Sequence, residues 1–141
     1  MRPTITEKEI MQEFPAIITL LTLFLLLATG LGVAKARIKY QIKAPATTGN
    51  VDFERVFRVQ MNTQESALTF LPALWLFSSY VSPLWAGILG LVWVLARVHY
   101  AIGYARANEK RAAGFILGLI ALAVLAGGAS LGVLMKIMAS L

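Results

Sequence analysis

The chain has 141 residues, of which 58% are hydrophobic and only 14% are charged, with a net charge of +6. Soluble domains are usually nearer half apolar and a quarter charged. The absence of cysteine and the single histidine exclude a disulfide scaffold, a cysteine nucleophile and the usual zinc sites. The basic residues gather at the ends of apolar stretches, which argues against a nucleic-acid-binding protein.

Three stretches contain no charged residue: 14–34, 66–96 and 112–135. A helix needs roughly 20 mainly apolar residues to cross a bilayer, so the first and last stretches each fit one crossing. The middle stretch is too long for one, and "SSYVSP" at 78–83 is typical of a turn. The sequence therefore predicts an all-α integral membrane protein, a bundle of four transmembrane helices at about 10–38, 53–80, 83–108 and 111–138 in a single domain, 1–141.

The first predicted helix, 10–38, is apolar enough to resemble a signal peptide. A charged, acidic segment precedes it and no clear small-residue cleavage site ends it, so we expect a retained membrane anchor. A soluble bundle is the alternative, but its helices would need polar faces. Neither the first nor the last predicted helix has a charged face.

Basic residues surround the first and third predicted loops: Lys35, Arg37, Lys39, Lys43, Arg55, Arg58, Arg106, Lys110 and Arg111. Arg2, Lys8 and Lys136 lie toward the opposite side. Cytoplasmic loops carry the excess of Lys and Arg, so these two loops are expected in the cytoplasm and both termini outside.

The second predicted helix opens with "FERVFRVQMNTQES", residues 53–66, before it becomes almost purely apolar. At about 100° per residue, its polar side chains fall within an arc of about 80°. They are Glu54, Arg58, Asn62 and Glu65. Charges inside a membrane span are costly and usually line a functional cavity, so this stripe predicts a site.

The third predicted helix carries a matching stripe within an arc of about 60°. Its members are Arg97, Tyr100, Tyr104 and Arg111. A short turn joins the two helices, so we expect them to be antiparallel neighbours whose polar ends share one pocket at the cytoplasmic side. The alternative is structural: Glu65 pairs with Arg97 or Arg58 and only fixes the register of the helices. His99 lies off the stripe and is interpreted as an interfacial or packing residue.

Cations, an amide, a carboxylate and phenols complement a small zwitterion that has both carboxylates and an amine. No protein nucleophile lies beside a base, so the nucleophile has to come from the ligand or from water. A transporter or channel component is another hypothesis, but its polar residues should be spread through the membrane depth. Here they crowd one end, and the small residues of the fourth helix suit close helix packing.

Two motifs, "FERVFRVQMNTQE" at 53–65 and "LARVHYAIGYARANEKR" at 95–111, closely resemble the MAPEG superfamily of membrane-associated proteins in eicosanoid and glutathione metabolism. Within it, the chain is most similar to the microsomal glutathione transferases and leukotriene C4 synthase, over about residues 14–135. The resemblance implies a homotrimer with glutathione bound between adjacent subunits near the cytoplasmic face. By motif, the tripeptide is held by Arg58, Asn62, Glu65, Tyr100 and Tyr104, and by Arg37 and Gln60 of the neighbouring subunit.

Arg111 matches the catalytic arginine of the family. A free thiol has a pKa of about 8.5, and a nearby cation favours the thiolate. An arginine stays charged at any working pH and can do this without titrating. The resemblance thus implies glutathione as co-substrate, no metal, and a thiolate that attacks a lipophilic electrophile or reduces a lipid hydroperoxide.

Two positions depart from leukotriene C4 synthase: Ser66 stands where that enzyme has a tyrosine, and Ile38 replaces a second active-site arginine. Both favour a broad glutathione transferase and peroxidase. The alternative is a non-enzymatic lipid-binding scaffold of the same family. We expect a multi-pass protein among membrane lipids, in a bacterial inner membrane or else in the endoplasmic reticulum, with no nucleic-acid partner.

Overall fold

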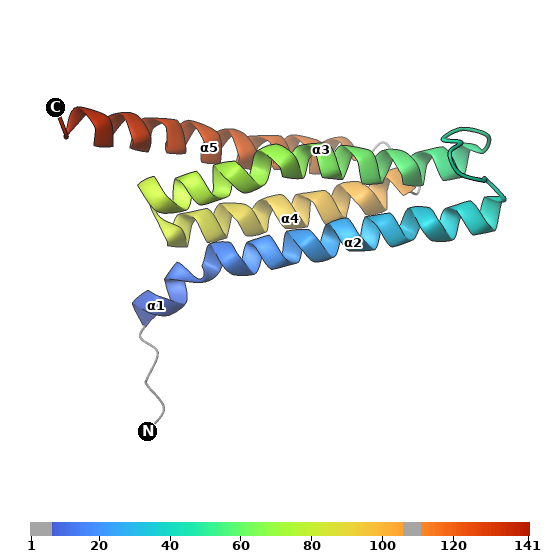
Figure 1. Cartoon of the computed structure of the whole chain (residues 1–141), viewed down its shortest axis with the longest axis horizontal. Helices are drawn as coiled ribbons and strands as arrows, with labels where there is room; N and C mark the ends of the chain where they lie inside the picture. The colour runs from blue at the N-terminus through green and yellow to red at the C-terminus, as the bar shows by residue number, and fades with distance from the viewer. Residues whose placement is uncertain (1–6, 106–110) are drawn as a thin grey trace, which may run out of the picture.

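The computed structural model describes residues 7–105 and 111–141, and every regular element in these two ranges is an α-helix. The helices are α1 (Glu7–Gln12), α2 (Phe14–Tyr40), α3 (Val51–Tyr80), α4 (Pro83–Ala105) and α5 (Arg111–Met138). The four long helices lie along one another (Figure 1). The loop between α2 and α3, the end of α4 and the start of α5 lie at one end, and the α3–α4 turn lies at the other.

The helix ends follow from local sequence. At the start of α3, the side chain of Asn50 accepts hydrogen bonds from the backbone N–H groups of Asp52 and Phe53, at 3.0 and 3.1 Å. Such a cap satisfies donors that the first turn cannot pair internally. Between α3 and α4, the Ser82 hydroxyl accepts from the Trp85 N–H at 3.4 Å, and Pro83 opens the helix. The turn expected at "SSYVSP" is therefore built by a cap and a proline at the first helical position.

Three segments are long and apolar enough to cross a membrane: Ile10–Tyr40, Pro83–Tyr104 and Ala112–Met138. The first of these segments runs from the end of α1 through α2. Glu13 separates the two helices, and a proline stands in the first turn of α2. α3 is not among them, because charges and amides occupy its first half. The fourth crossing, at 53–80, stays a prediction.

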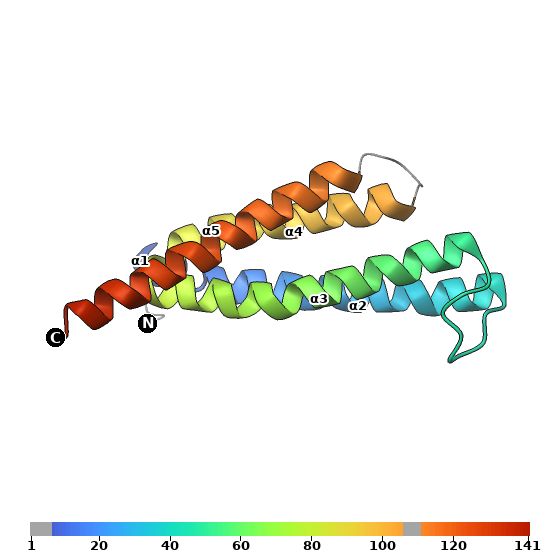
Figure 2. The same ribbon diagram turned by 90° about the horizontal axis from the view of Figure 1, so that it is seen from above.

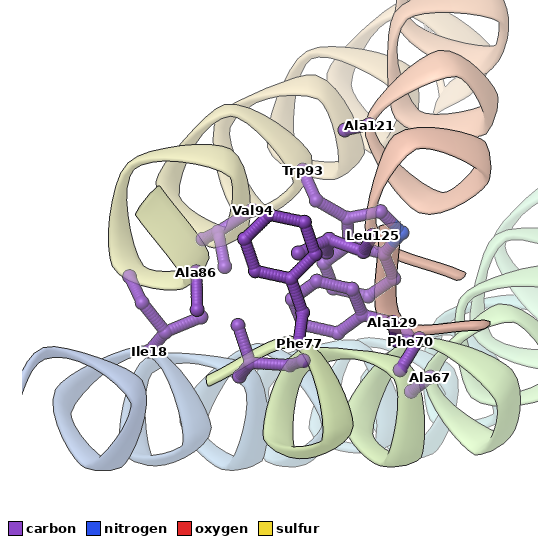
Figure 3. Close-up of a cluster of buried hydrophobic side chains, with 12 residues drawn as sticks. Ile18, Ala67, Phe70, Phe77, Ala86, Trp93, Val94, Ala121, Leu125 and Ala129 are labelled. Carbon is purple, nitrogen blue, oxygen red and sulfur yellow. The ribbon is translucent and has the colours of Figure 1, made fainter. Parts of the chain in front are cut away.

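Aromatic side chains of α3 and α4 form the centre of the core. The rings of Phe70 and Trp93 stack with centroids 3.9 Å apart, and both residues are fully buried. Leu74 of α3 and Leu125 of α5 are also fully buried. Figure 3 shows Leu125 beside Trp93 in this cluster. The outer surfaces of α2 and α5, by contrast, expose many large apolar side chains, as expected for helices that face lipid or other subunits.

A close contact between backbones joins α4 and α5. A Cβ atom on Gly114 would lie 2.7 Å from the carbonyl oxygen of Ala96 and 2.8 Å from the backbone nitrogen of Tyr100. Only glycine fits at this distance. Figure 2 shows that α4 and α5 stay together as a pair and diverge from α2 and α3 toward the end that carries the α2–α3 loop.

Candidate functional site

A hydrogen bond connects the two polar stripes. The Asn62 side-chain nitrogen, on α3, donates to the hydroxyl oxygen of Tyr100, on α4, at 2.7 Å. Tyr100 is only 4% exposed, and its ring lies 5.6 Å from that of Tyr104, between centroids. The fold therefore brings three of the predicted site residues together across the α3–α4 boundary.

These three side chains line a pocket of about 370 Å³, together with Ala112 and Phe115 of α5. Its lining residues belong to the first half of α3, the last turns of α4 and the first turns of α5. Figure 2 shows the two helix pairs diverging toward this end. The backbone contact at Gly114 positions the side of the pocket that α5 forms, because it holds the first turns of α5 against Tyr100. One face of the pocket is therefore polar and the other, from α5, is apolar.

The bond from Asn62 leaves the proton of the Tyr100 hydroxyl available. An oxygen that accepts one hydrogen bond can still donate its own proton to another group. No acceptor for this proton is found in the two ranges that the structure describes. A ligand that enters the pocket therefore meets a fixed phenol donor.

Arg58 and Glu65 lie at the surface of the isolated chain. Both side chains are exposed, and among the described side chains, 10–104 and 112–141, neither forms an ion pair, with the other or with Arg97. The ion pairs of the structural alternative are absent from this part of the chain. Arg58 lines a separate pocket of about 270 Å³ with Thr47, Thr48, Glu54 and Phe57, so one subunit does not bring all the stripe residues into one cavity.

Arg37 and Gln60 face away from the Asn62–Tyr100 pocket. The Arg37 guanidinium donates to the Ala46 carbonyl at 2.8 Å and lies 5.0 Å from the centre of the Phe53 ring, which fixes the α2–α3 loop. The Gln60 amide nitrogen lies 3.6 Å from where a Cβ on Gly30 of α2 would be. Neither residue therefore contributes to this pocket within its own chain.

Arg111 is the first residue of α5, and its side chain lies outside the part that the structure describes. Its backbone position is next to Ala112, which lines the pocket. The role implied by the family motif therefore stays a prediction. Among the side chains that the structure describes, 10–104 and 112–141, no group of three or more His, Asp or Glu residues is placed to hold a metal ion.

Arg97 belongs to the predicted stripe of the third helix, but the family motif gives it no role. It is only 5% exposed, and its guanidinium lies 5.4 Å from the centre of the Tyr100 ring. Its Nε and Nη1 atoms are buried without a hydrogen-bond partner in the described residues. A charge inside an apolar stretch, one helical turn before Tyr100, was the signal that could have singled it out.

The site is thus a polar pocket at one end of an apolar helical bundle with three candidate membrane spans. The family model of the MAPEG family matches residues 15–131. This chain belongs to the MAPEG family, as the two motifs predicted, and the apolar helices and the family together identify a membrane protein.

Named relatives support the same assignment. The chain is 51% identical to an uncharacterized protein of Synechocystis over 88% of this chain and 90% of that protein. It is 44% identical to human microsomal glutathione S-transferase 2, over 73% of this chain and 70% of the relative. It is 38% identical to leukotriene C4 synthase of Cavia porcellus, over 84% and 79%.

Proposed function

We propose that this protein is a membrane-bound glutathione transferase, which ionises the glutathione thiol and transfers the tripeptide to lipophilic electrophiles. The observation that carries the proposal is the hydrogen bond between Asn62 and Tyr100 inside a polar pocket of an otherwise apolar bundle. Polar groups inside a membrane-spanning bundle are costly and usually mark a functional site. The similarity to glutathione S-transferases supplies the substrate class.

The proposed chemistry begins with the thiol. Arg111, at the start of α5, supplies a permanent positive charge that favours the thiolate. The thiolate attacks an electrophilic carbon, a carbon–sulfur bond forms, and the leaving group departs with its electron pair. With a lipid hydroperoxide, two molecules of glutathione become the disulfide while the hydroperoxide becomes an alcohol and water.

The proposed assembly is a homotrimer in which each site lies between two subunits. Arg37 and Gln60 face away from the pocket of their own chain, as residues that serve a neighbour would. The outer faces of α2 and α5 expose enough apolar surface for contacts with other subunits and with lipid. In this arrangement α3 is the fourth crossing, and the glutathione site faces the cytoplasm, where the basic residues gather.

A conjugation assay on the detergent-purified protein tests the proposal. Glutathione and a chlorinated nitrobenzene should give the conjugate, and an organic hydroperoxide should be reduced. Arg111→Ala should bind glutathione nearly as the parent does but lose the thiolate absorbance near neutral pH. Its conjugation rate should fall steeply at pH 7 and recover partly as the pH rises through the unperturbed thiol pKa, about 8.5.

Arg55→Ala is the matched control, because Arg55 pairs on the surface with Asp52 at 3.0 Å and does not line the pocket. It should retain the parent's rate and pH profile. Glutathione binding without conjugation or reduction would favour the scaffold hypothesis. If the parent and Arg111→Ala shared one apparent pKa, Arg111 would not be the activating cation.

A further inference from the structure

Arg97 lies in the interior of the bundle, behind the wall of the pocket. Its guanidinium is 5.6 Å from the centre of the Trp93 ring and 5.4 Å from that of Tyr100. On α5, a Cβ on Gly118 would lie 3.8 Å from Arg97 Nε. The side chain is thus packed between aromatic rings of α4 and the backbone of α5 at Gly118.

No described side chain compensates this charge. Among the side chains that the structure describes, in 10–104 and 112–141, Arg97 has no ion-pair partner, and its Nε and Nη1 atoms have no hydrogen-bond partner. Aromatic rings attract a cation, but more weakly than a carboxylate does. A buried charge without a countercharge destabilises a fold, so Arg97 lowers the stability of the folded protein without ligand.

The charged and titratable groups around Arg97 are few. α2 has none along 14–34 and α5 has none along 112–135. On α3 the nearest along the helix are Arg58 and Glu65, both exposed and unpaired with Arg97. On α4 itself, Tyr100 lies beside Arg97 and His99 is exposed. The countercharge is therefore missing from the described part of the subunit.

The pocket lies on the other side of this arginine's aromatic neighbour. The Tyr100 ring lies 5.4 Å from the Arg97 guanidinium, and Tyr100 is also one of the residues that line the pocket. We propose that Arg97 is an electrostatic positioning residue: its charge is neutralised only when an anionic ligand occupies the pocket, and it favours the ionised form of the ligand's thiol. This inference rests on the proposed function.

The thiolate is the anion that fits this position. The carboxylates and ammonium of glutathione need several polar partners, which are found toward the end of the bundle that carries Arg58 and the basic loop. The thiol is the least polar ionisable group of the tripeptide and has to face the electrophile in the bilayer. It is therefore the group directed inward, toward Tyr100 and Arg97.

The expected shift of the bound thiol's pKa follows from the distance between the sulfur atom and the Arg97 charge. A unit charge about 10 Å away, at an effective dielectric constant of about 20, lowers a thiol pKa by roughly one unit, which is a tenfold change in the thiolate fraction below that pKa. Arg97→Met should therefore raise the apparent pKa of the bound thiol by about one unit. Arg97→Lys retains a charge and should restore much of this shift.

The test uses the full protein, purified in detergent, and two probes. Glutathione reports thiol ionisation through its thiolate absorbance as a function of pH. S-methylglutathione keeps the carboxylates and the amine but cannot ionise at sulfur. Arg97→Met should bind S-methylglutathione within about threefold of the parent, since the charges that hold the tripeptide are elsewhere. Arg55→Met controls for the loss of a surface arginine.

Stability without ligand is a second readout. Because the buried charge is uncompensated, Arg97→Met should unfold at the same temperature as the parent or higher, and the stabilisation that glutathione gives should shrink. A lower unfolding temperature without ligand would show that Arg97 is structural and overturn the inference. So would an unchanged thiol pKa in Arg97→Met, and then the proposed function would still stand. A parent that binds neither probe would overturn the proposed function itself.

Discussion

Replacing Gly114 by alanine tests the backbone contact that positions α5 against the pocket. The added Cβ would lie 2.7 Å from the Ala96 carbonyl oxygen and 2.8 Å from the Tyr100 nitrogen. Both neighbours are backbone atoms within a helix, so neither can turn aside, and α5 has to move away by several tenths of an ångström. Overpacking of this kind costs about 1–3 kcal/mol, against a gain of up to about 1 kcal/mol in helix propensity.

Gly127→Ala is the matched control. A Cβ at Gly127 meets nothing within 4 Å, so this variant gains the helix propensity without the clash. Both variants gain the helix propensity, so they should differ by the clash alone, about 1–3 kcal/mol, or on the order of 3–10 °C in apparent unfolding temperature. The measurement is thermal unfolding in one detergent, followed by titration with glutathione.

Gly114→Ala should also lose glutathione affinity, because Phe115 and Ala112 move with α5 and the pocket widens. Gly127→Ala should bind as the parent does. Equal unfolding temperatures and equal affinities in the two variants would refute the contact between α4 and α5 as the element that sets the pocket wall.

Three further predictions concern the site itself. Tyr100→Phe should weaken glutathione binding and destabilise the protein by about 1–3 kcal/mol, since the amide that donates to the phenol loses its acceptor; unchanged binding and unfolding would contradict this. Arg58→Ala and Glu65→Ala should each lower glutathione affinity tenfold or more, since a hydrogen bond to a charged group is worth about 1.5–3 kcal/mol. Calorimetric titration measures this affinity, and unchanged affinity in both variants would show that the stripe is structural. Arg37→Ala subunits mixed with Arg111→Ala subunits should recover part of the activity, because some boundaries then contain both arginines; a fully active monomer would rule this out.

The helical class could be predicted from the sequence because three long apolar stretches leave few other solutions. Helical periodicity also indicated that Asn62 and Tyr100 belong to facing stripes, and the structure puts them 2.7 Å apart. Periodicity gives the direction of a side chain around its helix. It does not show how far that side chain extends or which other groups it contacts.

Arg97 and Arg37 show this limit. A helical wheel places Arg97 on the same stripe as Tyr100, but its burial against Trp93 depends on the spacing between α4 and α5, which the close contact at Gly114 sets. Arg37 donates to a carbonyl in an irregular loop, at Ala46, and no periodic pattern predicts the path of such a loop. Long-range packing decided both positions.

The composition of α3 has a consequence for how the protein is made. A helix with charges and amides in its first half is a poor substrate for insertion into a bilayer by itself, since each charge at mid-membrane costs about 2.5–3.5 kcal/mol. Only Val81 and Ser82 separate α3 from the apolar α4, so the two can enter as a hairpin, with α4 carrying its partner across. Substitutions that loosen the contact of Phe70 with Trp93 should then appear first as failed integration and rapid degradation of the newly made chain, before any loss of catalytic rate can be measured.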